Sequence, residues 1–135
     1  MMEKEPAEPE NPLGTIVIGT LDPDPHITPK EMVRKSLKKA GFKCVDLGKK
    51  VPPADFAKQA KAENAEIMAV SINTSPAKNN LPALMAAIEA EGIKDKVTVM
   101  IGGAAVDKSD AEEIGALFGE TRDDAVVLAK KALGK

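Results

Sequence analysis

Five short apolar runs, each separated from the next by a stretch with helical spacing, constrain the fold of this chain more than any other feature. The runs expected to form strands are Leu13–Gly19, Phe42–Leu47, Ile67–Ile72, Val97–Ile101 and Ala116–Phe118. The first and third are continuously apolar, which is typical of central parallel strands covered on both faces. The alternation of strands and helices therefore predicts an α/β fold with a doubly wound, five-stranded parallel sheet.

The expected helices cover Pro29–Ala40, Pro53–Glu63, Pro76–Gly92, a short stretch capped by Asp107 or Ser109 that ends at Ile114, and Asp123–Leu133. The first has the clearest start signal, because Thr28 and Glu31 have the spacing of a capping box. Met32 is expected on the buried stripe of this helix, and Lys38 on its solvated face.

The folded part is expected to be one domain over residues 13–135, since 135 residues suffice for one core but not for two ordinary ones. Residues 1–12 are acidic, spaced by prolines and without apolar periodicity. Such a segment buries too little surface to order itself, so we expect a flexible, disordered tail.

Charge and hydropathy exclude several classes of partner. The net charge is -2, with both signs nearly balanced, so nucleic acid is not an expected partner. The sequence has neither an apolar run of bilayer length nor a signal-peptide pattern, so we expect a cytoplasmic protein without membrane contact. The single cysteine, Cys44, lies in an expected strand, where we interpret it as buried and inert.

The candidate functional residues lie at the ends of the strands or in the loops that follow them. These loops share one edge, because all carboxyl ends of a parallel sheet meet there. The loops expected there are Thr20–Thr28, Gly48–Pro52, Asn73–Ser75, Gly102–Val106 and Gly119–Thr121. The first contains Asp24 and the only histidine, His26. Neither a phosphate-binding P-loop nor a dinucleotide fingerprint follows the first strand. A phospho-acceptor receiver domain would need an aspartate after the third strand and a lysine after the fifth, and neither residue is there.

The spacing of the candidate residues matches a known family. Asp24-Pro25-His26 is followed by Ser71-Ile72-Asn73, with 41 residues between Pro29 and Ser71, and then by Gly102-Gly103. This resembles the cobalamin-binding domain family, with its Asp-x-His-x-x-Gly, Ser-x-Leu and Gly-Gly motifs. The sequence segments VDLGKKVPPADF and VMIGGAAV are most similar to segments of the corrinoid proteins of methyltransferase systems. Two positions depart from the pattern, since Pro29 replaces the glycine and Asn73 replaces the leucine.

The resemblance implies a flavodoxin-like or Rossmann-like cobalamin-binding fold and a role for each matching residue. His26 would replace the dimethylbenzimidazole of the cofactor as lower cobalt ligand, and Asp24 would accept the proton of its other ring nitrogen. Ser71 would meet the benzimidazole in a slot between sheet and helices. Ser75 would stand in for a serine that bonds the aspartate in some relatives. The full expected set is Asp24, His26, Ile27, Thr28, Ser71, Asn73, Ser75, Gly102, Gly103 and Ala104, with His26 as the metal ligand and no catalytic residue.

The implied function is that of a corrinoid protein, which carries a methyl group on cobalt between a donor-side and an acceptor-side methyltransferase. Such a protein is a carrier subunit rather than an enzyme by itself, and its methyl donor would be methanol, a methylamine or a methoxylated aromatic. Relatives usually add an N-terminal helical bundle above the corrin, whereas about twelve residues precede the first strand here, so a partner is expected to cover that face. Two alternatives remain: the small cobalamin-binding subunit of a carbon-skeleton mutase, and an interaction module that Pro29 has left without corrinoid.

Overall fold

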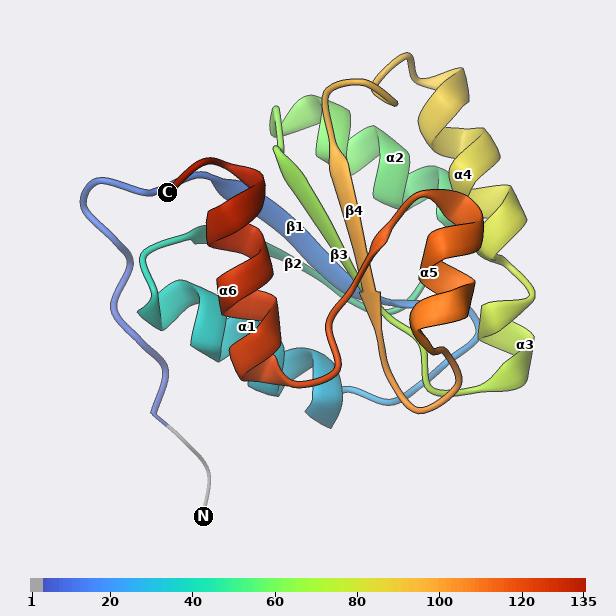
Figure 1. The fold of residues 1–135 in the computed structure, drawn as a ribbon, viewed down its shortest axis with the longest axis horizontal. Coiled ribbons are helices and arrows are strands. Elements are labelled where there is room, and N and C mark those ends of the chain that lie inside the picture. Colours follow the sequence, from blue (N-terminus) through green and yellow to red (C-terminus); the bar gives the residue numbers. More distant parts are fainter. Residues whose placement is uncertain (1–3) are drawn as a thin grey trace.

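A five-stranded parallel sheet forms the centre of the protein in this computed structural model, which describes residues 4–135 (Figure 1). Its strands are β1 (Thr15–Leu21), β2 (Lys43–Val51), β3 (Ile67–Ser71), β4 (Thr98–Gly102) and β5 (Leu117–Phe118). The strand order is β2-β1-β3-β4-β5, and every neighbouring pair is parallel. The predicted doubly wound sheet is therefore confirmed. The strand order reverses between β1 and β3, which is where sheets of this kind open a crevice at their carboxyl ends.

In the described residues, six helices cover the two faces of the sheet. They are α1 (Thr28–Lys39), α2 (Pro53–Ala62), α3 (Ser75–Lys78), α4 (Leu81–Ala90), α5 (Lys108–Ile114) and α6 (Arg122–Ala132). Helices α1 and α6 lie side by side on one face, and α2 and α4 pack together on the other, with α3 and α5 near its carboxyl edge (Figure 1). We refer to these as the α1/α6 face and the α2/α4 face.

Two apolar layers separate the helices from the sheet, and they differ in size. The layer on the α2/α4 face is made of buried side chains between positions 17 and 111 of the sequence, among them the fully buried Phe56, Met68 and Leu84. The layer on the α1/α6 face is smaller; its buried members are Ile16, Ile18, Leu37, Phe42, Ile67, Ala69, Met100, Ala125 and Ala129. The smaller layer leaves room for a cavity on the α1/α6 face.

The start of α1 differs from the sequence prediction. Thr28 is its first residue, and the preceding Ile27 already has helical dihedral angles and makes no side-chain cap. The expected capping box does not form, because the Glu31 carboxylate accepts hydrogen bonds from Lys30 and Arg34 instead. Met32 was expected to be buried, but it is 46% exposed.

The helix expected over Pro76–Gly92 is split into α3 and α4. A continuous helix would place the ring of Pro82 against the carbonyl of Lys78, and proline lacks the N–H that the helix requires. The chain instead starts again, with Pro82 as the second residue of α4. At the next helix, Asp107 rather than Ser109 is the N-cap, and it forms a capping box with Asp110.

Strand β2 is longer than expected, so residues 48–51 are not a loop at the carboxyl edge. The register with β1 shifts at Gly48 and again before Val51, and Gly48 and Lys50 both have positive φ. These irregularities let the chain remain paired with β1 to Val51 instead of turning away at Leu47.

Residues 4–12 form neither helix nor strand and lie along α1 (Figure 1). The Glu5 carboxylate pairs with Arg34 at 2.6 Å and with Lys38 at 2.6 Å, and Glu8 pairs with Lys38 at 2.9 Å. Lys38 is therefore covered and not on a solvated face as expected. The flexibility of this segment stays a prediction, as does the structure of residues 1–3, which lie outside the described part. Over the described residues, no helix has the length and apolar content to cross a bilayer.

Candidate functional site

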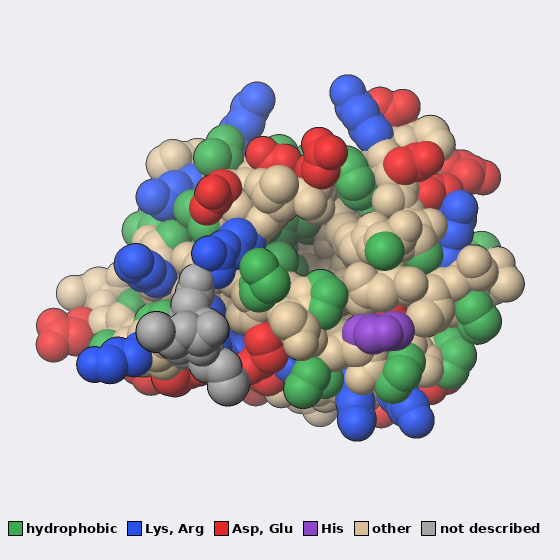
Figure 2. All heavy atoms as spheres, turned by 90° about the horizontal axis from the view of Figure 1, so that it is seen from below, with side chains coloured by type: hydrophobic (Ala, Val, Ile, Leu, Met, Phe, Trp, Pro, Cys, Tyr) green, Lys and Arg blue, Asp and Glu red, His purple; other side chains and the backbone are tan. Residues whose placement is uncertain are grey.

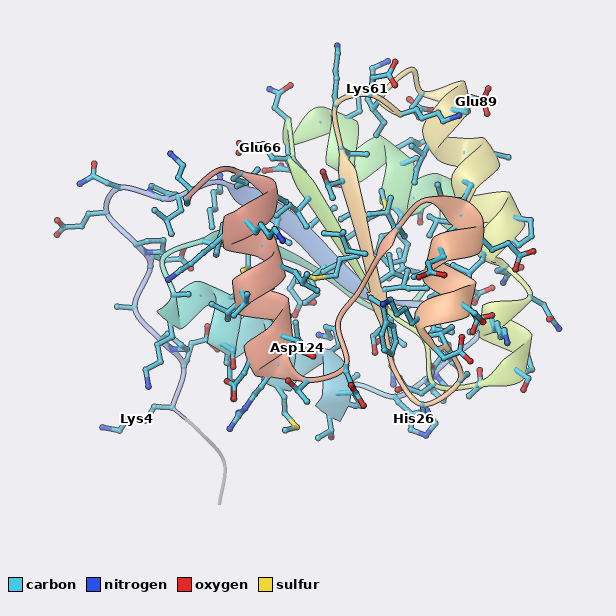
Figure 3. The ribbon with its side chains drawn as sticks, in the orientation of Figure 1. Lys4, His26, Lys61, Glu66, Glu89 and Asp124 are labelled. Atoms are coloured by element: carbon cyan, nitrogen blue, oxygen red, sulfur yellow. The ribbon has the colours of Figure 1, made fainter. Side chains whose placement is uncertain are left out.

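Asp24 and His26 form a close pair in the loop after β1. The His26 Nδ1 atom is 2.7 Å from the Asp24 Oδ1 atom, and the His26 backbone N–H donates to the same oxygen at 3.0 Å. A carboxylate only accepts hydrogen bonds, so the ring hydrogen belongs on Nδ1 and the lone pair is left on Nε2. The Asp24 side chain is completely buried, whereas that of His26 is 57% exposed at the lower edge of the molecule (Figure 3). The pair thus offers one oriented imidazole nitrogen to a ligand outside.

The electrostatics of Asp24 favour its ionised form. Burial opposes ionisation, but hydrogen bonds from His26 and Asn73 outweigh it and keep the pKa of the Asp24 carboxyl below its ordinary value. The loop around the pair is anchored as well, because the buried Thr20 hydroxyl donates to the His26 carbonyl at 2.8 Å. His26 is therefore held from both its ring and its backbone.

Asn73 connects the Asp24–His26 pair to the ends of two other strands. Its backbone N–H and its side-chain Nδ2 donate to the Asp24 Oδ2 atom at 2.6 and 3.1 Å. The same Nδ2 donates to the Ser71 hydroxyl at 3.1 Å, and Oδ1 accepts the Ala104 N–H at 3.3 Å. Five expected site residues, from the end of β3 and the loops after β1, β3 and β4, are thus joined in one hydrogen-bonded cluster.

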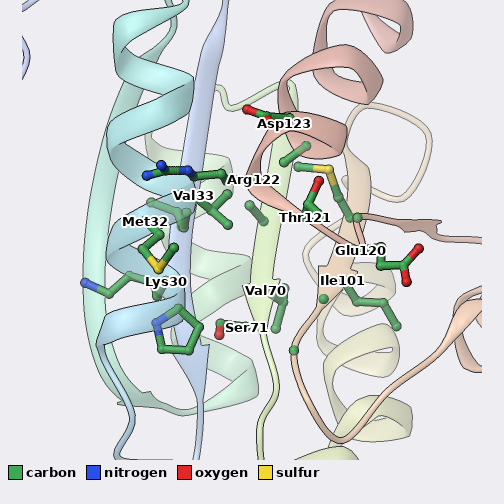
Figure 4. Close-up of a pocket in the computed structure, with 18 residues that line it drawn as sticks. Lys30, Met32, Val33, Val70, Ser71, Ile101, Glu120, Thr121, Arg122 and Asp123 are labelled. Atoms are coloured by element: carbon green, nitrogen blue, oxygen red, sulfur yellow. The ribbon is translucent and has the colours of Figure 1, made fainter. Parts of the chain in front are cut away.

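A cavity of about 430 Å³ lies beside this cluster, between the sheet and helices α1 and α6. We call it the slot; its lining includes Ile18, Ala69, Ser71, Met100, Gly102, Gly103 and Ala125 from the sheet side and α6, and Pro29, Lys30, Met32 and Val33 from α1. Most of its buried members are apolar, and the exception is Lys30, which is paired with Glu31 and Asp46. Figure 4 shows α1 on one side of the slot and residues 120–123, before and at the start of α6, on the other. Figure 2 shows His26 on the same face of the molecule as a central hollow.

The two glycines after β4 bring neighbouring loops into contact. A Cβ atom on Gly103, whose φ is +122°, would overlap the Ile72 backbone, and one on Gly102 would lie 2.6 Å from the Gly119 carbonyl oxygen. Both glycines belong to the expected set of site residues. The structure adds that they let the loops after β3, β4 and β5 pack together around the slot.

Three expected residues lie away from the slot lining and the cluster. Ile27 and Thr28 are exposed at the start of α1, and Ser75 is exposed at the start of α3. Asn73 takes the position beside Asp24 that was expected of Ser75. Cys44 is partly buried, and burial raises the pKa of its thiol to about 12, which disfavours the reactive thiolate.

Sequence reasoning did not assign the α1 and α6 sides of the slot, which include Lys30, Val33 and residues 120–123. One usable signal was present: the loop Gly119–Thr121 follows the fifth strand on the same edge as His26. The position of this loop does not reveal the strand order, and it is the strand order that places α6 opposite α1.

The donor set suits a metal that arrives with most of its coordination positions filled. Across residues 4–135, no group of three or more His, Cys, Asp or Glu side chains is placed to hold a metal ion. A single oriented imidazole is too little for a free ion, but it could supply one ligand to a metal that a macrocycle already holds.

The fold and the site together define a class: a doubly wound α/β domain that binds a ligand at the switch point of its sheet, beside a carboxylate-oriented histidine. The comparison with protein families then gives the particular one. The chain belongs to the B12 binding domain family, whose model matches residues 14–129.

Known proteins similar to this chain carry corrinoid names. It is 39% identical to trimethylamine corrinoid protein 1 of Methanosarcina acetivorans over 98% of this chain and 61% of that protein. It is 38% identical to dimethylamine corrinoid protein 3 of Methanosarcina mazei over 90% of this chain and 73% of that protein. The monomethylamine corrinoid protein of Methanosarcina barkeri superposes with a TM-score of 0.83 at 27% identity, over 90% of this chain and 60% of that one. The chain thus spans about three fifths of the first of these relatives.

Proposed function

We propose that this chain binds a corrinoid cofactor and carries a methyl group on its cobalt between methyltransferase proteins. The observation that supports binding best is the Asp24–His26 pair, which presents an oriented imidazole beside an apolar slot. Family membership and the corrinoid names of the relatives support the same conclusion.

The residues present fit a corrinoid whose lower base has left cobalt. His26 would bind cobalt through Nε2, and Asp24 would hold the hydrogen on Nδ1 and keep the ring oriented. The slot would take the displaced base, with Ser71 at its polar end and Ile18, Ala69 and the other buried apolar side chains around it. The corrinoid supplies the cobalt position that carries the methyl group. The protein supplies the site and leaves the chemistry of transfer to its partners.

The proposed methyl donor is a methylamine, because the relatives named above are corrinoid proteins for trimethylamine, dimethylamine and monomethylamine. The proposed partners are two methyltransferases, one on the donor side and one on the acceptor side. The proposal includes the cytoplasmic location expected from the sequence.

Pro29 does not argue against binding. It is the second residue of α1, where its missing N–H has no intrahelical partner to lose, and its ring lines the slot without filling it. The alternative of a module that has lost its corrinoid therefore has less support than the carrier. The mutase alternative has less support as well, because the relatives named above are methylamine corrinoid proteins.

The test is uptake of hydroxocobalamin by the purified chain, followed by desalting and an absorption spectrum. The wild-type protein should retain colour, and His26→Ala should shift the spectrum because the imidazole that would bind cobalt is removed. Val127→Ala, at an exposed position of α6 outside the slot lining, is the matched control and should behave as the wild type. If wild type and control elute colourless, corrinoid binding is refuted. Tighter binding of adenosylcobalamin than of methylcobalamin would favour the mutase alternative.

A further inference from the structure

A continuous series of hydrogen bonds links the slot to the histidine, and Asn73 is its central member. Ser71 Oγ lies 3.1 Å from Asn73 Nδ2, which lies 3.1 Å from Asp24 Oδ2, and Asp24 Oδ1 lies 2.7 Å from His26 Nδ1. Ser71 lines the slot, whereas Asn73 does not. The position of Asn73 is therefore between the two proposed attachment points of the cofactor and not against the cofactor itself.

The orientation of the Asn73 amide follows from its partners. Its Oδ1 atom accepts the backbone N–H of Ala104, so the oxygen and nitrogen cannot be exchanged without placing two donors together. The two hydrogens on Nδ2 then point to Asp24 and to Ser71. Every polar atom of this amide has a partner inside the protein, which is the pattern of a group that orients its neighbours.

The contact with Asn73 also determines how Ser71 faces the slot. Because Asn73 is the donor, the Ser71 oxygen accepts there, and the hydroxyl hydrogen is left for another acceptor. Across residues 4–135 the Ser71 hydroxyl donates to no protein acceptor. Its hydrogen is therefore available to an acceptor atom of whatever occupies the slot.

We propose that Asn73 is a positioning residue with two effects: it fixes Asp24 against His26, and it directs the Ser71 hydroxyl as a hydrogen-bond donor into the slot. The inference rests on the proposed corrinoid function and adds a specificity to it. A lower base with an acceptor ring nitrogen binds this slot better than a phenolic base, which has none. A leucine at position 73, as in the motif that this chain resembles, keeps the backbone N–H bond to Asp24 but makes neither side-chain hydrogen bond.

The first test uses the ligand-free protein, and it exploits the presence of a single histidine in the chain. The ring ¹⁵N chemical shifts of His26 are recorded at about pH 9, where an ordinary imidazole is neutral and the shifts report its tautomer. The wild type should show mainly the Nδ1–H tautomer. Asn73→Leu should move the shifts toward those of a free imidazole, whereas Ser71→Ala should leave them unchanged. Unchanged shifts in Asn73→Leu would overturn the effect on Asp24.

The second test compares retention of cobalamin with retention of a cobamide whose lower base is a phenol. One neutral hydrogen bond predicts about a 3- to 10-fold preference for cobalamin in the wild type. Ser71→Ala and Asn73→Leu should both remove that preference. A preference that survives in Asn73→Leu but not in Ser71→Ala would overturn the effect on Ser71.

The two tests separate this inference from the proposed function. If no variant retains either cobamide, corrinoid binding fails, and the ligand-free ¹⁵N spectra alone decide whether Asn73 orients Asp24. Far-UV circular dichroism confirms that each variant is folded. Asn73→Ser, which is too short to reach both partners, replaces Asn73→Leu if that variant does not fold, with the same expected results.

Discussion

Replacing Gly103 by alanine should destabilise the protein strongly, because the space for a Cβ atom is occupied by backbone. The new carbon would overlap the carbonyl group of Ile72, and φ at this position is +122°. Ile72 N donates to the Gly102 carbonyl at 2.8 Å, and its own carbonyl accepts from Ala105 at 3.2 Å, so moving the loop strains both bonds. Loss of these bonds and the unfavourable φ together cost about 2 to 6 kcal/mol. That corresponds to a fall in Tm of about 8 °C or more.

The assay is thermal unfolding followed by far-UV circular dichroism, since the chain has no Trp or Tyr for fluorescence. Gly92→Ala is the matched control: its φ is +72°, and a Cβ there meets no heavy atom within 4 Å. Only the backbone strain then remains, about 1 kcal/mol. If the decrease in Tm is the same for both variants, close packing of the loops around Gly103 is refuted.

Three further predictions concern groups away from this loop. Hydrogen bonds from Arg34 lower the pKa of Glu31 from 4.5 to about 2, so its contribution to stability is full above pH 4.5 and is lost as the pH falls toward 2. The Tm of the wild type should therefore fall more on acidification to about pH 3 than that of Glu31→Gln, and an equal fall would contradict this. Cys44, whose thiol pKa burial raises to about 12, should resist iodoacetamide at neutral pH in the native protein and react in urea; rapid native labelling would refute its burial. Phe56→Ala removes a fully buried ring and should cost about 3 to 5 kcal/mol in urea unfolding, and a loss below about 1 kcal/mol would show that the site collapses.

The strands were predictable because their apolar runs are continuous, a pattern that needs no knowledge of the partner strand. The end of β2 was not, because Lys50 adopts a positive φ that lets the strand continue past the expected turn. The split between α3 and α4 was within reach, since Pro82 cannot lie in the middle of a helix. The absence of a cap at Thr28 was not, because the competing partners of Glu31, above all Arg34, are recognisable only once the side chains are placed.

The site was predictable to the extent that it is local. Asp24 and His26 are two residues apart, and the structure places their side chains in contact, as the resemblance to the family implied. Asn73 stood out only as a departure from a motif, and its role depends on the 2.6 Å approach of its backbone to a residue 49 positions earlier. The α6 side of the slot, around Thr121, required the whole sheet order before it could be assigned.

The smaller apolar layer on the α1/α6 face has a consequence for folding. On the α2/α4 face, side chains of the protein fill the space between the helices and the sheet. On the α1/α6 face, the slot leaves part of this space without side chains. An apolar ligand group in the slot would extend the hydrophobic core of this face and would contact both α1 and α6. Occupancy should therefore slow amide hydrogen exchange in α1 and α6 selectively, because binding energy released between these helices opposes their local opening. In such a domain, the cofactor is a structural component of one half of the fold.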